Sequence, residues 1–131
     1  MEPPDSGVRG SIVLEERGEV SVLVLTGEHD MDSAPELRGA IARLADAGRG
    51  VVVSVDEAEF IDSTIVRTLF EGDRLLLAKG RRLVLNVGAG SVAEKLLDVS
   101  GALEHLMWCD SVEESVLFAD PGRSGEPRRG S

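Results

Sequence analysis

The sequence predicts an α/β domain with a mixed, largely parallel β-sheet that begins with a hairpin. Two observations predict it. Near the start of the chain, two apolar stretches of strand character are separated only by the turn residues 17–19. Beyond them, strand-like and helix-like stretches alternate, and strand–helix–strand repeats imply right-handed crossovers between parallel strands.

The predicted hairpin comprises residues 11–16 and 20–25, in which apolar side chains alternate as they do in strands. An acidic loop is expected to follow the hairpin. Ser33 and Glu36 then have the spacing of a capping box, which predicts the start of the first helix. Gly48 is placed to end that helix.

The next strand and helix flank the centre of the chain. Residues 51–55 are nearly all β-branched, which is typical of a central strand that is covered on both faces. A second helix is expected from about Ser63 to Lys79, with Gly80 as its stop. Within it, Gly72 would allow a close approach to the sheet.

The remaining predicted elements are shorter. Residues 82–87 are expected to form a strand, residues 91–99 a short helix, and residues 103–108 a last edge strand. Ser111 and Glu114 have the spacing of a second capping box, which predicts a terminal helix.

The length of 131 residues fits one domain with a buried core. We assign this domain to residues 11–119. Residues 1–10 and 120–131 are rich in Gly, Pro, Ser and charged residues and have no periodicity, so we expect a disordered lead and a disordered tail.

Charge and composition narrow the class of partner. The formal net charge of −10 disfavours direct contact with nucleic acid and with anionic membrane surfaces, so a protein partner is expected. The lone Cys109 excludes an internal disulfide and cannot form a metal cluster by itself. There is no apolar run of membrane-spanning length and no signal-peptide pattern, so we expect a cytoplasmic location.

A polar junction lies between the central strand and the second helix, at Asp62, Ser63 and Thr64. A helix N-terminus has unpaired N–H groups and favours negative charge, so a serine there is well placed to carry a phosphate. The simpler interpretation is that Asp62 or Ser63 is an N-cap. Ser63 also begins a polar helical face that continues through Arg67 and Glu71 and is expected to be exposed.

This junction resembles the motif of the STAS domain, the family of bacterial anti-sigma-factor antagonists. In that family a Phe- or Met-led Asp-Ser-Ser/Thr-Gly-Leu-Gly joins a strand to a helix. The matching residues are Phe60, Ile61, Asp62, Ser63 and Thr64. Residues 27–30, Gly-Glu-His-Asp, are similar to the family's Gly-Glu-Leu-Asp, whereas residues 65–67, Ile-Val-Arg, replace Gly-Leu-Gly. The resemblance covers roughly residues 11–119.

The resemblance implies a sheet with helices on one face and a protein that is not an enzyme and needs no cofactor. It implies binding to an anti-sigma factor of the serine-kinase type, which would release a sigma factor. Phosphorylation of Ser63 by that kinase, with the kinase's ATP, would end the binding, since a dianion opposes docking through charge repulsion and desolvation. The expected partner-binding residues are Glu28, Asp30, Asp62, Ser63, Thr64 and Arg67.

Alternatives remain open. The first is a STAS module that uses the same surface without phosphorylation, in a larger signalling or lipid-transport assembly. The second is a small hydrolase with Ser63 and His29, although the sequence has no Gly-x-Ser-x-Gly and His29 is expected to be a solvated loop residue. The third is a phospho-receiver domain, but this chain lacks the acidic pair and the lysine that such a domain needs. The acidic loop also lacks the glutamate spacing of a cation site, so no metal is expected.

Overall fold

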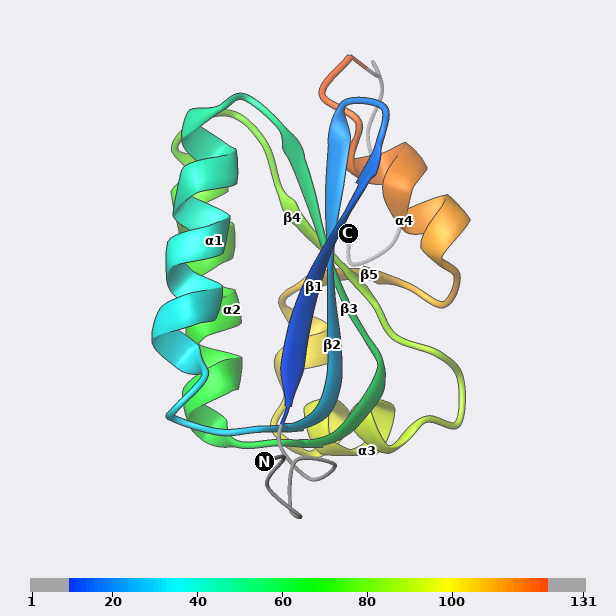
Figure 1. Ribbon diagram of the computed structural model, residues 1–131. Coiled ribbons are helices and arrows are strands. Elements are labelled where there is room, and N and C mark those ends of the chain that lie inside the picture. Colours follow the sequence, from blue (N-terminus) through cyan, green and yellow to red (C-terminus); the bar gives the residue numbers. More distant parts are fainter. Residues whose placement is uncertain (1–9, 123–131) are drawn as a thin grey trace, which may run out of the picture.

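Within residues 10–122, five strands form one sheet in the order β1-β2-β3-β4-β5 (Figure 1). They are β1 Ser11–Arg17, β2 Val20–His29, β3 Gly50–Ile61, β4 Leu83–Asn86 and β5 Met107–Cys109. β1 pairs with β2 in the antiparallel sense, and the later pairs are parallel. The predicted hairpin and largely parallel sheet are confirmed. The computed structural model describes residues 10–122, so most of the expected lead and tail lies outside the described residues.

In the described residues, four α-helices cover the sheet: α1 Ala34–Asp46, α2 Ser63–Leu77, α3 Val92–Val99 and α4 Val112–Ala119. The first three bury their apolar sides in one core cluster on one face. α4 lies across the other face, where Val116 and Phe118 pack against Val22 and Val52 (Figure 1). The expectation of helices on one face therefore needs this correction. β3 is buried on both sides from Gly50 to Val55, so its second apolar face also requires cover.

Two predicted boundaries were wrong. β2 and β3 run beyond residues 25 and 55, because register shifts in their pairing keep the two strands together as far as His29 and Ile61. The first half of the expected strand 103–108 is instead a short 3₁₀-helix, Ala102–Glu104, and only Met107–Cys109 pairs with the sheet. No helix in the described part of the chain is long and apolar enough to cross a membrane.

The serines before the helices play different roles. Ser111 Oγ accepts a hydrogen bond from the Glu114 N–H at 3.2 Å, so this cap is confirmed. Ser33 precedes α1, but its side chain accepts no capping hydrogen bond, so the predicted box with Glu36 was wrong. Its hydroxyl instead lies 3.1 Å from the carbonyl oxygen of Asp30.

Two contacts fix α2 in place. A Cβ at Gly72 would lie 2.9 Å from Ile41 Cδ1, so this glycine allows α2 to approach α1 rather than the sheet as expected. At the other end of α2, the Asp73 carboxylate accepts two hydrogen bonds from Arg82, each 3.0 Å, and a third of 3.0 Å from the Leu83 N–H. This buried carboxylate ties α2 to the start of β4.

Candidate functional site at the start of helix α2

The ends of β2 and β3 meet at one edge of the sheet, and α1 and α2 both begin there (Figure 1). His29 lies opposite Ile61 in the parallel register. The Asp62 N–H donates to the His29 carbonyl oxygen across 3.2 Å. This bond joins the loop that follows β2, which carries Asp30, to the first turn of α2, which carries Ser63.

Asp62 is the N-cap of α2. Its backbone is extended, with φ −94° and ψ 179°. Its Oδ1 accepts hydrogen bonds from the N–H groups of Thr64 at 2.9 Å and Ile65 at 3.2 Å. The predicted cap is confirmed. The second carboxylate oxygen forms no hydrogen bond within residues 10–122.

Ser63 is the first residue of α2 and is exposed, whereas Thr64 is half-buried. The Ser63 hydroxyl forms no hydrogen bond within the described residues. Thr64 presents less of its side chain to solvent.

The predicted polar face of α2 is exposed as expected. It consists of Ser63, Arg67, Glu71 and Arg74. Arg38 on α1 donates to Glu71 Oε1 at 3.2 Å, and Arg67 forms no ion pair within residues 10–122. The guanidinium one turn after Ser63 is thus not committed to a carboxylate of the domain.

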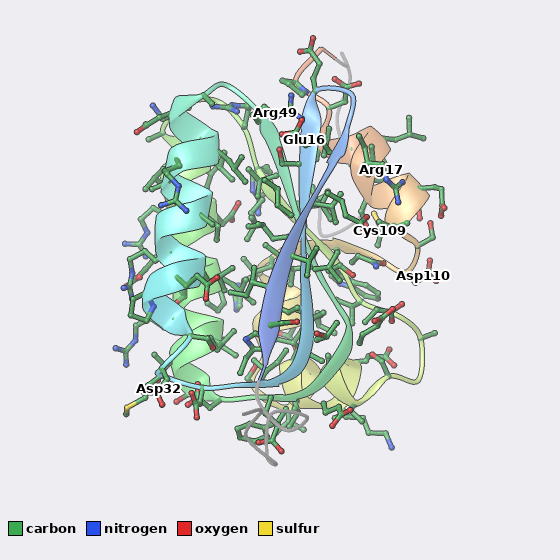
Figure 2. The ribbon with its side chains drawn as sticks, viewed as in Figure 1. Glu16, Arg17, Asp32, Arg49, Cys109 and Asp110 are labelled. Atoms are coloured by element: carbon green, nitrogen blue, oxygen red, sulfur yellow. The ribbon has the colours of Figure 1, made fainter. Side chains whose placement is uncertain are left out.

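The loop after β2 is acidic and outward-facing. Glu28 and Asp30 are exposed. Asp30 Oδ1 accepts the Asp32 N–H at 2.9 Å, which makes a local Asx-type turn. Figure 2 shows Asp32 pointing away from the domain near the start of α1. With Asp62 on the neighbouring segment, these carboxylates give this edge of the sheet a negative charge.

His29 is buried, so the expectation of a solvated loop residue was wrong. Because β2 continues beyond its predicted end, the His29 ring enters the core. Nε2 lies 3.0 Å from the Thr26 carbonyl oxygen, and Nδ1 lies 3.0 Å from Ser33 Oγ. Both ring nitrogens are therefore engaged away from Ser63, which removes the base that a serine hydrolase would need.

Two exposed apolar side chains were missed as candidate contacts. Phe60 on β3 is 43% exposed, and Met31 in the acidic loop is 65% exposed. Single exposed apolar side chains are common on protein surfaces, but these two lie within two residues of Asp30 and Asp62 and are therefore candidate contacts. The available signals were the leading position of Phe60 in the junction motif and the place of Met31 between two aspartates.

The described residues contain no group of three or more His, Cys, Asp or Glu side chains that could hold a metal ion. Asp30 and Asp62 each use one carboxylate oxygen on backbone N–H groups. The site therefore offers carboxylates that can accept hydrogen bonds from another molecule and an exposed serine hydroxyl that can be modified.

The chain matches the family model described as "Mlab, STAS domain" over residues 12–107. This chain belongs to the STAS domain family. The family consists of regulatory binding proteins rather than enzymes, in agreement with the expected role. No curated protein sequence matches the chain significantly.

Solved structures of anti-sigma factor antagonists share the fold. One from Mycobacterium paratuberculosis is 20% identical with a TM-score of 0.74, over 91% of this chain and 98% of that one. SpoIIAA in its unphosphorylated form is 22% identical with a TM-score of 0.63, over 79% and 92% of the two chains. Bacillus SpoIIAA in its phosphorylated form is 23% identical with a TM-score of 0.60, over 81% and 96%. The SpoIIAA-like fold of this STAS domain is thereby confirmed.

Proposed function

We propose that this STAS domain is an anti-sigma-factor antagonist that binds a serine-kinase-type anti-sigma factor in the cytoplasm and so frees a sigma factor. Phosphorylation of Ser63 by that kinase ends the binding. The observation that carries the proposal is the exposed Ser63 hydroxyl, which forms no hydrogen bond within residues 10–122 and directly follows the Asp62 cap of α2. Membership of the STAS family and the fold shared with SpoIIAA, which is known in both forms, support it.

The unmodified surface is suited to docking. The carboxylates of Asp62, Glu28 and Asp30 can accept hydrogen bonds or pair with cations of the kinase. The exposed side chains of Phe60 and Met31 supply apolar area that docking would remove from water. Because Asp62 already holds the first turn of α2, this turn would lose little conformational entropy on binding.

A phosphate on Ser63 changes this surface in two ways. It adds about −1.5 to −2 charges at pH 7 next to the existing carboxylates. It also meets a helix end whose donors are partly occupied, since Asp62 Oδ1 already accepts from Thr64 and Ile65. Even with one guanidinium nearby, the phosphate keeps oxygen atoms that water must solvate, and docking would have to remove that water.

The proposal is tested by incubating the protein with ATP and each serine-kinase-type anti-sigma factor of its source organism, followed by intact-mass measurement. We expect one phosphoryl group on the wild type and none on Ser63→Ala. Thr64→Val is the matched control, because it retains shape at the next position and should still be modified. Equal modification of Ser63→Ala and wild type would remove Ser63 from the switch.

A second candidate is a STAS interaction module that works without phosphorylation. Two observations favour it: residues 65–67 depart from Gly-Leu-Gly, and the matching family model carries the description "Mlab". Under this alternative, none of the kinases modifies the protein. Alanine at Asp62 would still weaken its capture of a native partner.

A further inference from the structure

β1 and the adjacent side of α1 form an exposed edge of the domain. Within residues 10–122, β1 pairs with β2 on one side and with no strand on the other, and nearly all of its residues are exposed. Figure 1 looks onto this edge, with β1 in front of β2 and α1 in front of α2. We propose that a second copy of this chain docks on this edge in an antiparallel, two-fold symmetric arrangement. This inference does not rest on the proposed function.

The hairpin turn determines which backbone groups of β1 point outward. Two residues join β1 to β2, and the first of them, Gly18, has a φ of 62°, as in a type II′ turn. Such a turn is flanked by a hydrogen-bonded pair, here Arg17 and Val20, and pairs of this kind alternate along an antiparallel ladder. Every other residue therefore directs its N–H and C=O groups away from β2, where another strand can pair with them. These residues are Ile12, Leu14 and Glu16.

An apolar groove accompanies the free edge. It lies between β1 and α1 and has a volume of about 170 Å³. Leu14 of β1 and Ala40 of α1 both line it. Leu14 and its neighbour Val13 are each 50% exposed, so two large apolar side chains stand next to each other on an unpaired strand. A second strand on this edge would remove apolar area from water.

The charges on α1 favour a second copy as the occupant. Glu36 and Arg43 line the groove about two helical turns apart, and neither forms an ion pair within residues 10–122. Midway between them lie Gly39 and Ala40, whose small size allows another helix to approach. When two α1 helices meet antiparallel at this midpoint, Glu36 of each copy faces Arg43 of the other. One surface thus supplies both halves of a two-fold interface.

The same axis suits β1. Antiparallel pairing centred on Leu14 places Leu14 opposite its own copy, with Ile12 opposite Glu16 and Val13 opposite Glu15, so no two carboxylates are directly opposed. Because Leu14 and Ala40 line one groove, the centres of the strand and helix patterns lie close together. β1 and α1 also run in the same direction, from the bottom of Figure 1 to the top. A single two-fold axis therefore makes both pairs antiparallel.

The test is sedimentation equilibrium of the whole protein over a range of concentrations. We expect a reversible equilibrium between monomer and dimer for the wild type. Glu36→Arg and Arg43→Glu should each raise the dimer Kd at least about tenfold, because each turns two attractive contacts into two repulsive ones. The double variant Glu36→Arg/Arg43→Glu exchanges the charges and should restore dimerisation.

Glu113→Arg on α4 and Arg74→Glu on α2 are the matched controls. Both residues are exposed and lie outside the groove, and these variants change the net charge as the two single reversals do. They should dimerise like the wild type. General charge repulsion predicts the opposite result for Glu36→Arg, because this variant lowers the net negative charge and would then dimerise more tightly. Circular dichroism establishes that each variant retains the fold.

Amide hydrogen exchange tests the strand pairing separately. At dimer concentrations, the Leu14 N–H should be protected in the wild type and should exchange faster in Glu36→Arg. The Val13 N–H, which points toward β2, should be protected in both proteins.

Three results would each overturn the proposal. The first is a monomer at every concentration, and the second is a dimer whose Leu14 N–H exchanges freely. The third is a set of charge variants in which the single reversals leave the Kd unchanged or the double variant fails to recover dimerisation. Ser63 and Asp62 do not line the groove, so each of these results leaves the proposed function standing.

Discussion

Arg38 of α1 donates a hydrogen bond to Glu71 of α2 across 3.2 Å. This interhelical pair occupies the carboxylate that Arg67 would otherwise meet one turn further along its own helix. Arg67 is exposed and forms no ion pair within residues 10–122. It stands where the STAS motif usually has glycine, four residues after Ser63, so the two side chains share one helical face.

We therefore predict that Arg67 pairs with a phosphate on Ser63. Charge-assisted, bidentate pairing between guanidinium and phosphate is favourable at this spacing. Phosphorylation should shift the melting temperature more favourably in the wild type than in Arg67→Ala. The measurement is a double-mutant cycle, comparing thermal unfolding of the two proteins with and without the phosphate.

Arg74→Ala is the control for Arg67→Ala, since Arg74 lies on the same exposed face but further along α2. Removing it should leave the effect of the phosphate as in the wild type. Equal shifts in wild type and Arg67→Ala would show that Arg67 does not contact the phosphate. Exposed ion pairs contribute only about 0–1 kcal/mol, so the phosphate-dependent difference, rather than stability itself, is the readout.

The phosphate is predicted to reside on Ser63 and not on Thr64. Ser63 is exposed at the first position of α2, and Thr64 is turned partly into the domain. Fragmentation mass spectrometry of the modified protein should place the group on Ser63. A spectrum that assigns it to Thr64 alone contradicts this prediction.

Asp62→Ala is predicted to cost about 0.5–2 kcal/mol of unfolding free energy, because it removes the cap of α2. Asp62→Asn keeps a capping oxygen and should be nearly as stable as the wild type. Denaturant unfolding measures both. If Asp62 also contacts the partner, both variants should weaken binding, and unchanged affinity in the folded variants would leave Asp62 with a structural role only.

Asp30→Asn is predicted to slow phosphorylation of Ser63 while barely changing the melting temperature. The asparagine oxygen can still accept the Asp32 N–H, so the turn is retained and only the charge is lost. Initial rates of phosphate incorporation measure the effect. Equal rates in Asp30→Asn and wild type would remove the acidic loop from the kinase contact.

Arg82→Ala is predicted to destabilise the fold strongly. It leaves the buried Asp73 carboxylate with only the Leu83 N–H, and breaking a buried pair costs about 3–5 kcal/mol. Arg82 is partly exposed, so a value near the lower end is expected. Arg38→Ala, which breaks an exposed pair, should cost at most about 1 kcal/mol in the same denaturant unfolding measurement. Similar losses in the two variants would contradict this interpretation of Asp73.

Features that depend on neighbouring residues could be predicted from the sequence. The hairpin, the start of α2 at Ser63 and the cap at Asp62 were predicted correctly, because alternation and capping depend on residues close in the chain. The exposure of Ser63 and Arg67 also follows from helical spacing alone.

Features that depend on contacts between residues far apart in the chain could not be predicted from the sequence. His29 is buried because pairing with β3 extends β2, and the register shifts that allow this have no clear signature in either strand alone. Gly72 faces Ile41 of another helix rather than the sheet, and a helical pattern does not specify which neighbour its small residue meets. Residues 51–55 indicated a strand covered on both faces, but only the assembled sheet shows that α4 provides the cover on the second face.

The most direct test of the switch is the Kd of the cognate anti-sigma kinase for the unmodified protein and for the protein phosphorylated on Ser63, measured by titration calorimetry. We predict that the phosphate raises the Kd at least about tenfold, equivalent to about 1.4 kcal/mol. Equal Kd values for the two forms would contradict the proposal that Ser63 phosphorylation ends the binding.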